Sequence, residues 1–167
     1  MEDVGRIYLD TNIFIIAFER RDEIGDMLLQ SFVAAGRRHA KLFVTSELTL
    51  AELLVTPYRN GDTILAETYE TSISTNSWLE VLPIERSMFL CTAMLRSQYS
   101  GLKLPDALHL SVAAAAGCSH LLTDDYGIKG EYRLAGSRYG LEFDTPPLAV
   151  LRPDEPTLSS LLKSLAE

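Results

Sequence analysis

The chain has 167 residues, a formal net charge of −8 and a hydrophobic content of 47%. Its length suits one domain, so we expect a single domain over residues 1–167 with a core that needs no disulfide or metal to hold it together. The negative charge argues against nucleic-acid binding through the field of the whole protein, although a local basic patch remains compatible with it.

The composition points to a protein of the cytoplasm. Cys91 and Cys118 show no C-x-x-C or metal-ligand spacing, and we expect both to be small buried hydrophobic residues. Reduced thiols fit a cytosolic protein. Residues 1–3 are acidic rather than basic, so no signal peptide is evident. The longest uncharged stretch, residues 107–123, is too short and too polar to span a bilayer.

Short apolar segments alternate with helical patterns along the chain. In chain order we predict a strand at 6–10, a helix from Thr11 or Asn12 to Phe18, a helix at 23–36, a strand at 41–44, a helix at 47–55 ended by Pro57, a helix at 61–77, a strand at 79–82, helices at 85–99 and 105–116, a strand at 120–122, a candidate fifth strand at 148–151 and a helix at 157–165. This alternation predicts an α/β three-layer sandwich, with a central, mostly parallel sheet of four to five strands flanked by helices.

Asp10 stands at the end of the first predicted strand. Ligands of open α/β sheets gather at the carboxyl ends of parallel strands, so a carboxylate there is a candidate metal ligand or general base. The alternative is a helix N-cap, a position that Asp suits well. Because Thr11 or Asn12 could cap the helix equally well, we expect Asp10 to be redundant as a cap.

Glu52 lies in a helical segment that is apolar nearly all round. Leucines at positions 50, 53 and 54 fill most of its circumference, which is typical of a buried helix. A glutamate is rarely fully buried unless something pairs with it. The alternative places Glu52 at the rim with its carboxylate in water. Glu47, in the first turn of the same helix, is well explained by the helix dipole.

Asp106 follows Pro105 in the first turn of another nearly apolar helix. First-turn placement offers the helix dipole as a structural explanation for this acid. His109 lies three residues further on, and such a histidine is more often a hydrogen-bonded core or rim residue than a ligand.

Asp124 and Asp125 end the 120–122 strand, as Asp10 ends the first strand. Paired acids before Tyr126 and Gly127 could serve only to form a turn. However, the carboxyl ends of parallel strands lie at the same edge of a sheet. We therefore expect these acids to approach Asp10.

Four acids from separate segments form one candidate site: Asp10, Glu52, Asp106 and Asp125. Two carboxylates ~6 Å apart repel by about 3 kcal/mol at an effective dielectric constant of ~20. Several such pairs would burden a domain whose stability is only about 5–15 kcal/mol. A divalent cation removes the conflict, and oxygen-only ligands select Mg²⁺ or Mn²⁺. Such sites orient water and stabilise developing charge in phosphodiester hydrolysis.

The acids occur in four motifs that follow one another in the chain, at residues 8–15, 49–54, 104–110 and 121–125. In order and spacing, from residue 6 to residue 130, these motifs resemble the PIN domain. Within that family the chain is similar to VapC-type toxins. The resemblance implies a metal-dependent ribonuclease, usually a homodimer, that is inhibited by an antitoxin encoded beside it.

The resemblance also implies roles for individual residues. The acidic set that it implies is Asp10, Glu52, Asp106 and Asp125. Thr11, Asn12 and Thr123 match polar positions that support the ligands or the attacking water in the family. Asp124 and Glu47 stay open as alternatives to Asp125 and Glu52.

We therefore expect an endoribonuclease, the toxin of a type II toxin–antitoxin pair. One or two Mg²⁺ or Mn²⁺ ions would sit among the four acids, and a water oriented by Asp10 or Asp125 would attack an RNA phosphodiester in line. RNA phosphates need local positive charge. The candidates are Arg20, Arg21, Arg37, Arg38 and Lys41.

Other functions remain open. One is a non-catalytic PIN-fold binding or regulatory module, against which the complete acid set argues, and another is a PIN nuclease outside a toxin pair. A phosphotransfer enzyme or receiver fits less well. The D-x-D pattern of aspartate nucleophiles fails at Asn12, and no lysine follows a late strand as a receiver would require.

Overall fold

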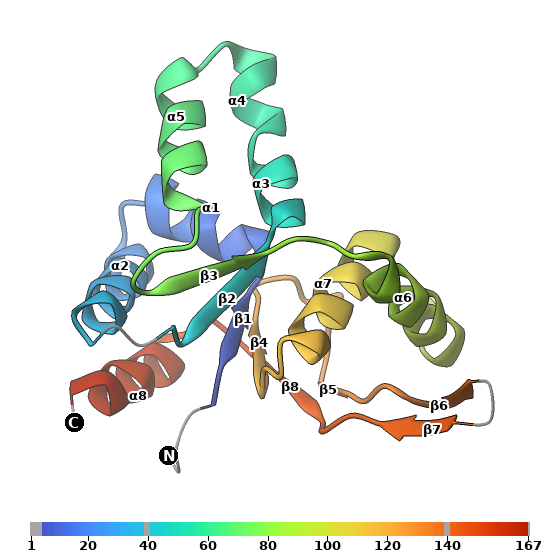
Figure 1. Ribbon diagram of the computed structural model, residues 1–167. Coiled ribbons are helices and arrows are strands. Elements are labelled where there is room, and N and C mark those ends of the chain that lie inside the picture. The colour runs from blue at the N-terminus through green and yellow to red at the C-terminus, as the bar shows by residue number, and fades with distance from the viewer. Residues whose placement is uncertain (1–4, 39–40, 139–140, 167) are drawn as a thin grey trace.

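The computed structural model describes residues 5–38, 41–138 and 141–166. The strands are β1 (Ile7–Leu9), β2 (Phe43–Ser46), β3 (Leu79–Leu82), β4 (His120–Leu122), β5 (Glu131–Tyr132), β6 (Ala135–Arg138), β7 (Leu141–Asp144) and β8 (Leu148–Leu151). The helices are α1 (Thr11–Glu19), α2 (Glu23–Arg37), α3 (Glu47–Leu53), α4 (Val55–Asn60), α5 (Thr63–Ser72), α6 (Arg86–Gln98), α7 (Leu104–Ala115) and α8 (Glu155–Ala166). Helices flank a central sheet, so the predicted α/β sandwich is confirmed (Figure 1).

The central sheet has six strands in the order β3-β2-β1-β4-β8-β5. The first five run parallel, and β5 pairs antiparallel with β8. Tyr8 in β1 is paired with Val44 on one side and with Leu121 on the other. The carboxyl ends of β1 and β4 are therefore neighbours, which is the arrangement that the acid hypothesis requires.

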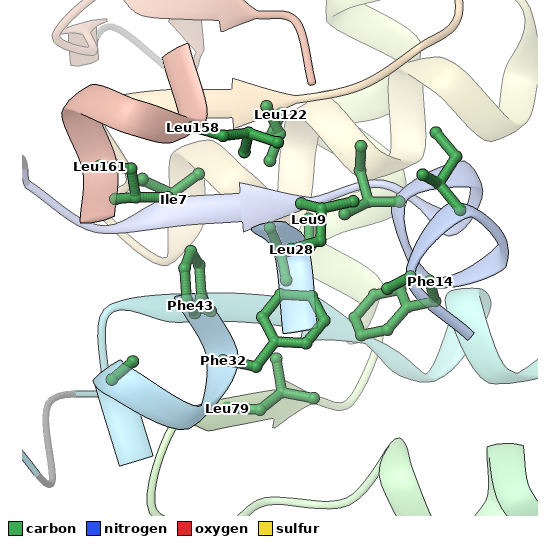
Figure 2. Packing of buried hydrophobic residues seen from close by; sticks show 14 of the residues in the cluster. Ile7, Leu9, Phe14, Leu28, Phe32, Phe43, Leu79, Leu122, Leu158 and Leu161 are labelled. Atoms are coloured by element: carbon green, nitrogen blue, oxygen red, sulfur yellow. The ribbon is translucent and has the colours of Figure 1, made fainter. Parts of the chain in front are cut away.

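The middle strand sends alternate side chains to opposite faces, as the two-residue period of a strand requires. Ile7 and Leu9 join the core beneath α1, α2 and α8, whereas Tyr8 joins the core beneath α6 and α7. Figure 2 shows the first core, where the rings of Phe32 and Phe43 meet edge to face with centroids 5.5 Å apart. This packing fixes β1 on both faces and directs the Tyr8 side chain toward α7.

Helix α7 is buried along most of its length and packs beside β2, β4 and β8. It begins beside Pro105, whose missing N–H has no hydrogen bond to lose in a first turn. Asp106 and His109, three residues apart, lie on one face of this helix. Helix α7 thus holds both ionisable side chains on one rigid element.

The structure corrects the predicted helices after β2. The prediction that Pro57 ends the helix was wrong, because α3 passes directly into α4, and Pro57 occupies the first turn of α4, where proline is tolerated. Gly61 ends α4 with a left-handed φ of 68°. The next helix, predicted at 61–77, is shorter at both ends: it begins at Thr63, where the Asp62 side chain caps the N–H of Leu65, and it ends at Ser72. Helices α4 and α5 project together away from the sheet (Figure 1).

Three strands were missed. Strand β5 has two residues, and β6 and β7 form a separate two-stranded antiparallel hairpin (Figure 1). The sequence of β6 is Ala-Gly-Ser-Arg, which has no apolar alternation to reveal it. The sheet is consequently one strand wider than the four to five predicted.

The longest uncharged stretch forms part of the core. Residues 107–123 include most of α7, a short connection and β4, and most of their apolar side chains are buried. No helix in the three described ranges is long and apolar enough to cross a membrane.

Candidate active site

Asp10 connects the end of β1 to the start of α1. Its backbone is extended, with φ −73° and ψ 160°, and its Oδ1 accepts a 2.7 Å hydrogen bond from the N–H of Thr11. The expectation that Asp10 is redundant as a cap was therefore wrong, because the residue at the strand–helix junction is the one whose backbone suits capping. Its other oxygen, Oδ2, accepts from Asn12 Nδ2 at 2.8 Å and from Thr123 Oγ1 at 2.6 Å.

Thr123 joins the ends of β1 and β4. Its hydroxyl donates to Asp10 and accepts hydrogen bonds from Asn12 Nδ2 at 3.0 Å and from the N–H of Asp125 at 2.9 Å. Asn12 Oδ1 in turn accepts a 2.8 Å hydrogen bond from the N–H of Asp124. The polar side chains at positions 12 and 123 thus hold the first acid and the backbone of the last two.

Glu52 is brought to Asp10 by two bridging residues. Its Oε2 accepts hydrogen bonds from the Thr11 hydroxyl and from His109 Nε2, the latter at 3.0 Å. His109 Nε2 also lies 3.5 Å from Asp10 Oδ1. Burial opposes ionisation of Glu52, but the hydrogen bonds from His109 and Thr11 outweigh it, and the pKa of Glu52 is lowered. The glutamate is both paired and at the rim, with 32% of its side chain exposed.

Asp106 and Asp125 interact through charge. Burial raises the pKa of Asp106, and the nearby charges of Asp125 and Asp10 raise it further, while Lys103 opposes the shift. The acid of α7 therefore lies within electrostatic reach of the acids at the ends of β1 and β4. All four predicted acids lie at one edge of the sheet.

The two alternative acids lie in different settings. Glu47 is exposed in the first turn of α3, where the helix dipole accounts for it. Asp124 is half-buried and is bonded through its backbone to Asn12, whereas the charge of Asp125 acts on Asp106. Of Asp124 and Asp125, only the charge of Asp125 contributes to the raised pKa of Asp106.

The donor chemistry of the site fits a hard divalent cation. All four acids offer carboxylate oxygens, and the raised pKa of Asp106 reflects burial and crowding of like charge that a cation would relieve. Within residues 5–38, 41–138 and 141–166, no three His, Cys, Asp or Glu side chains are already gathered as metal ligands. A cation bound by all four acids would therefore have to bring the Asp10 and Glu52 carboxylates closer to those of Asp106 and Asp125.

Arg152, just beyond β8, was not predicted to take part. Its guanidinium donates to the carbonyls of Thr123 at 2.9 Å, Asp125 at 2.8 Å and Ile128, and it lies 4.7 Å from the centroid of the Tyr126 ring. The N–H of Gly127 donates to Asp125 Oδ1 at 2.7 Å, and a Cβ at position 127 would meet this oxygen at 2.9 Å. The loop that carries Asp125 is thus held by a charged donor and a close backbone turn.

A groove of about 450 Å³ opens beside the acids. Asp106 and Gly127 lie in its lining, so the groove adjoins the site, and it is also lined by Lys103, Lys129 and Glu131. The two lysines are exposed and place positive charge next to the carboxylates.

The basic residues predicted to bind RNA lie in two places, between α1 and α2 (Arg20 and Arg21) and before β2 (Arg37, Arg38 and Lys41), and their role in RNA binding stays a prediction. Arg20 is paired with Asp22 at the connection between α1 and α2. Arg37, Arg38 and Lys41 precede β2, so they lie toward the amino end of the sheet, away from the acids.

A comparison with protein families now bears on this geometry. A family profile described as PIN domain matches residues 7–130. The chain belongs to the PIN domain family. A comparison with curated proteins finds no match.

Solved structures of low sequence identity share this PIN fold. A toxin–antitoxin complex from Klebsiella pneumoniae matches with 23% identity and a TM-score of 0.53, over 74% of this chain and 95% of that one. Mycobacterium tuberculosis VapC20, a sarcin–ricin loop cleaving toxin, matches with 14% identity and a TM-score of 0.58, over 72% and 92%. VapBC2 from Rickettsia felis, bound to a promoter DNA fragment, matches with 18% identity and a TM-score of 0.56, over 71% and 87%.

The matched PIN region contains all four acids, together with Thr11, Asn12 and Thr123. It ends before β6, β7 and β8, so the hairpin and the strand that leads into Arg152 lie outside it. This PIN domain therefore completes its sheet, and supports its Asp125 loop, with residues beyond the family match.

Proposed function

We propose that this PIN domain is a Mg²⁺- or Mn²⁺-dependent endoribonuclease and the toxin of a type II toxin–antitoxin pair in the cytoplasm. The observation that carries the proposal is the proximity of four acids from separate elements: Asp10 and Asp125 follow β1 and β4, Glu52 lies on α3, and Asp106 lies on α7. The presence of toxins and toxin–antitoxin complexes among the structures that share its fold supports the toxin assignment.

The four acids would hold the cation through carboxylate oxygens. When bound, the cation would supply positive charge for the attacking water and the leaving oxygen of the phosphodiester. Asp10 would be the most rigid of these groups, because three hydrogen bonds fix both of its oxygens. Asp125, whose Oδ1 accepts a hydrogen bond from the N–H of Gly127, would orient the attacking water.

The RNA strand would lie in the groove beside Asp106. Lys103 and Lys129 supply the local positive charge there that the net charge of −8 denies to the surface as a whole. Glu131 on the same lining partly offsets the positive charge of the two lysines.

The test compares RNA cleavage by the wild type with that by Asp106→Asn and Asp124→Asn. The pKa of Asp106 is raised by burial and by nearby charge rather than by hydrogen bonds. The asparagine of Asp106→Asn therefore removes the charge without breaking a hydrogen-bond network. We expect Asp106→Asn to lose more than the ~10–100-fold typical of outer-sphere changes, and Asp124→Asn to retain most activity. Asp10→Asn should also be inactive, but it replaces an acceptor of three hydrogen bonds and needs a folding control.

The outcomes separate the possible functions. Cleavage that needs Mg²⁺, stops with EDTA and fails in Asp106→Asn supports the nuclease. Equal cleavage by the wild type and both variants would remove the acids from the mechanism. Mn²⁺ binding that is lost in Asp106→Asn, without cleavage of any RNA offered, would instead favour a binding or regulatory module.

The partner and the assembly need their own measurements. We expect a homodimer, which light scattering of the purified chain would detect, and a small reading frame beside the gene whose product binds the chain and stops cleavage. RNA cleavage without any such neighbour would point to a PIN nuclease outside a toxin pair.

A further inference from the structure

A chain of buried polar side chains runs from β2 to Glu52. The Tyr8 hydroxyl lies 2.8 Å from Ser46 Oγ and 2.9 Å from His109 Nδ1, and the opposite nitrogen of His109 meets Glu52. Tyr8 is fully buried and His109 is only 2% exposed, so water does not reach the middle of this chain. Only its last member, the Glu52 carboxylate, is open to solvent.

The hydrogen bonds of this chain have one consistent direction. Ionised Glu52 can only accept, so Nε2 of His109 carries the hydrogen that faces it. In the neutral ring Nδ1 is then an acceptor, which takes the hydrogen of Tyr8, and Tyr8 in turn accepts from Ser46. Among the residues described, no buried side-chain N or O atom lacks a partner, so the network is complete.

The network restricts what Glu52 can do. Both of its hydrogen bonds, from His109 and from Thr11, fall on Oε2, which leaves Oε1 without a donor among the described residues. A glutamate side chain has three rotatable bonds and loses much freedom when ordered. Holding Oε2 from two directions removes that freedom before any ligand arrives.

We propose that Tyr8 and His109 are positioning residues that orient Glu52 so that Oε1 is the oxygen it offers to a divalent cation. This inference rests on the proposed function, because it assigns a task to the same site. Neither residue touches the RNA or the cation; each acts through Glu52. Outer hydrogen-bond partners of ligating carboxylates generally contribute to metal affinity in this way.

The fold supplies a matched control in Tyr69. This tyrosine is also buried, at 1% exposure, and its hydroxyl donates to a carboxylate, that of Glu19. Tyr69 belongs to the core beneath α1, α2 and α8, on the face of the sheet opposite to Tyr8. Either Tyr→Phe change removes the hydroxyl of a buried tyrosine and its hydrogen bonds, but only Tyr8 is linked through His109 to Glu52.

The first experiment needs neither metal nor activity. Nitrogen-15 NMR of the histidine rings in the metal-free full chain reports which nitrogen carries the hydrogen. We expect the Nε2–H form for His109, with a slowly exchanging ring proton, and a faster-exchanging one in Tyr8→Phe. An Nδ1–H form in the wild type would overturn the inference, whatever the RNA assays show.

The second experiment measures Mn²⁺ affinity by calorimetric titration of the wild type, Tyr8→Phe and Tyr69→Phe, with urea unfolding as a measure of stability. We expect about tenfold weaker binding in Tyr8→Phe and unchanged binding in Tyr69→Phe, even where the two variants lose similar stability. Equal affinity in Tyr8→Phe and the wild type would overturn the positioning role.

These outcomes also distinguish the two proposals. A wild type that binds no Mn²⁺, with the Nε2–H form present, would overturn the proposed function and with it the cation-directed role. If the wild type cleaves RNA and Tyr8→Phe binds Mn²⁺ as tightly as the wild type does, the proposed function stands and only this inference is overturned.

Discussion

The Thr123 hydroxyl donates a 2.6 Å hydrogen bond to Asp10 Oδ2 and thereby ties the end of β4 to the end of β1. The Oγ1 atom of Thr123 also accepts hydrogen bonds from Asn12 Nδ2 and from the N–H of Asp125. One buried hydroxyl therefore connects the first and last acids of the site, and changes at this position should disturb both.

We expect Thr123→Val to lose stability and nearly all RNA cleavage. The change keeps the shape of the side chain but removes a donor and an acceptor from a fully buried position, which costs about 1–3 kcal/mol for each group left unpaired. Thr92→Val is the control, because Thr92 is 2% exposed and bonds Met88 and Ser111 away from the acids. Urea unfolding and a cleavage assay would show similar destabilisation but activity loss only at position 123; equal activity in both variants would contradict the prediction.

Asp106→Asn should stabilise the metal-free protein at neutral pH. In the folded protein the pKa of Asp106 is raised above its ordinary value of 3.8. Just above that pH the folded state therefore binds more protons than the unfolded state. Stability therefore falls as pH rises through this window, and the loss is complete above the folded pKa. Thermal unfolding between pH 3 and pH 7 should show a variant advantage that vanishes at the acid end, and Mn²⁺ should raise the melting temperature of the wild type only. A variant less stable than the wild type at pH 7 would show that crowding is not the dominant effect.

Arg152→Ala should destabilise the Asp125 loop and reduce cleavage. Three backbone carbonyls lose a charged donor, and hydrogen bonds to charged groups contribute about 1.5–3 kcal/mol each. The matched change is Arg133→Ala, which breaks an exposed pair with Asp144 and should have little effect on stability. Hydrogen exchange of residues 123–128 and cleavage rates would check this, and unaltered exchange in Arg152→Ala would refute it.

The double variant Lys103→Ala/Lys129→Ala should bind single-stranded RNA with a weaker salt dependence. Each phosphate contact contributes ~0.7 to the slope of log K against log salt, so two lost contacts should reduce that slope by about 1.4. Lys41→Ala is the control, because this lysine precedes β2 and lies away from the acids. Titrations in EDTA across a range of salt concentrations would give the slopes. An unchanged slope in the double variant would remove the groove as the RNA path.

Elements with strong apolar patterns could be predicted from the sequence. The strands at 79–82, 120–122 and 148–151 have the predicted bounds, because each is a short, mostly apolar run. The four acids lie at the predicted edge of the sheet, because alternation with helices makes the strands parallel and parallel strands end at the same edge. The second strand lies two residues later than predicted, because Thr45 and Ser46 pair in the sheet although they are polar.

The supporting contacts could not be predicted from local patterns. Arg152 bonds carbonyls 24 to 29 residues away, and only the pairing of β8 with β4 brings them together. His109 was interpreted as a hydrogen-bonded core residue more readily than as a ligand, which agrees with its burial, but its link to Glu52 depends on which face of β1 carries Tyr8. The spacing of three residues from Asp106 was the available signal.

Strand β8 pairs with β4 inside the sheet, although it follows the end of the matched family region at residue 130. A fragment that ends at that residue would leave β4 as an edge strand, whose unpaired N–H and C=O groups can pair with strands of other chains. It would also lack Arg152, whose guanidinium donates to backbone carbonyls of the loop that carries Asp125. Trimming this protein to its recognisable family portion should therefore yield aggregates, not a minimal enzyme.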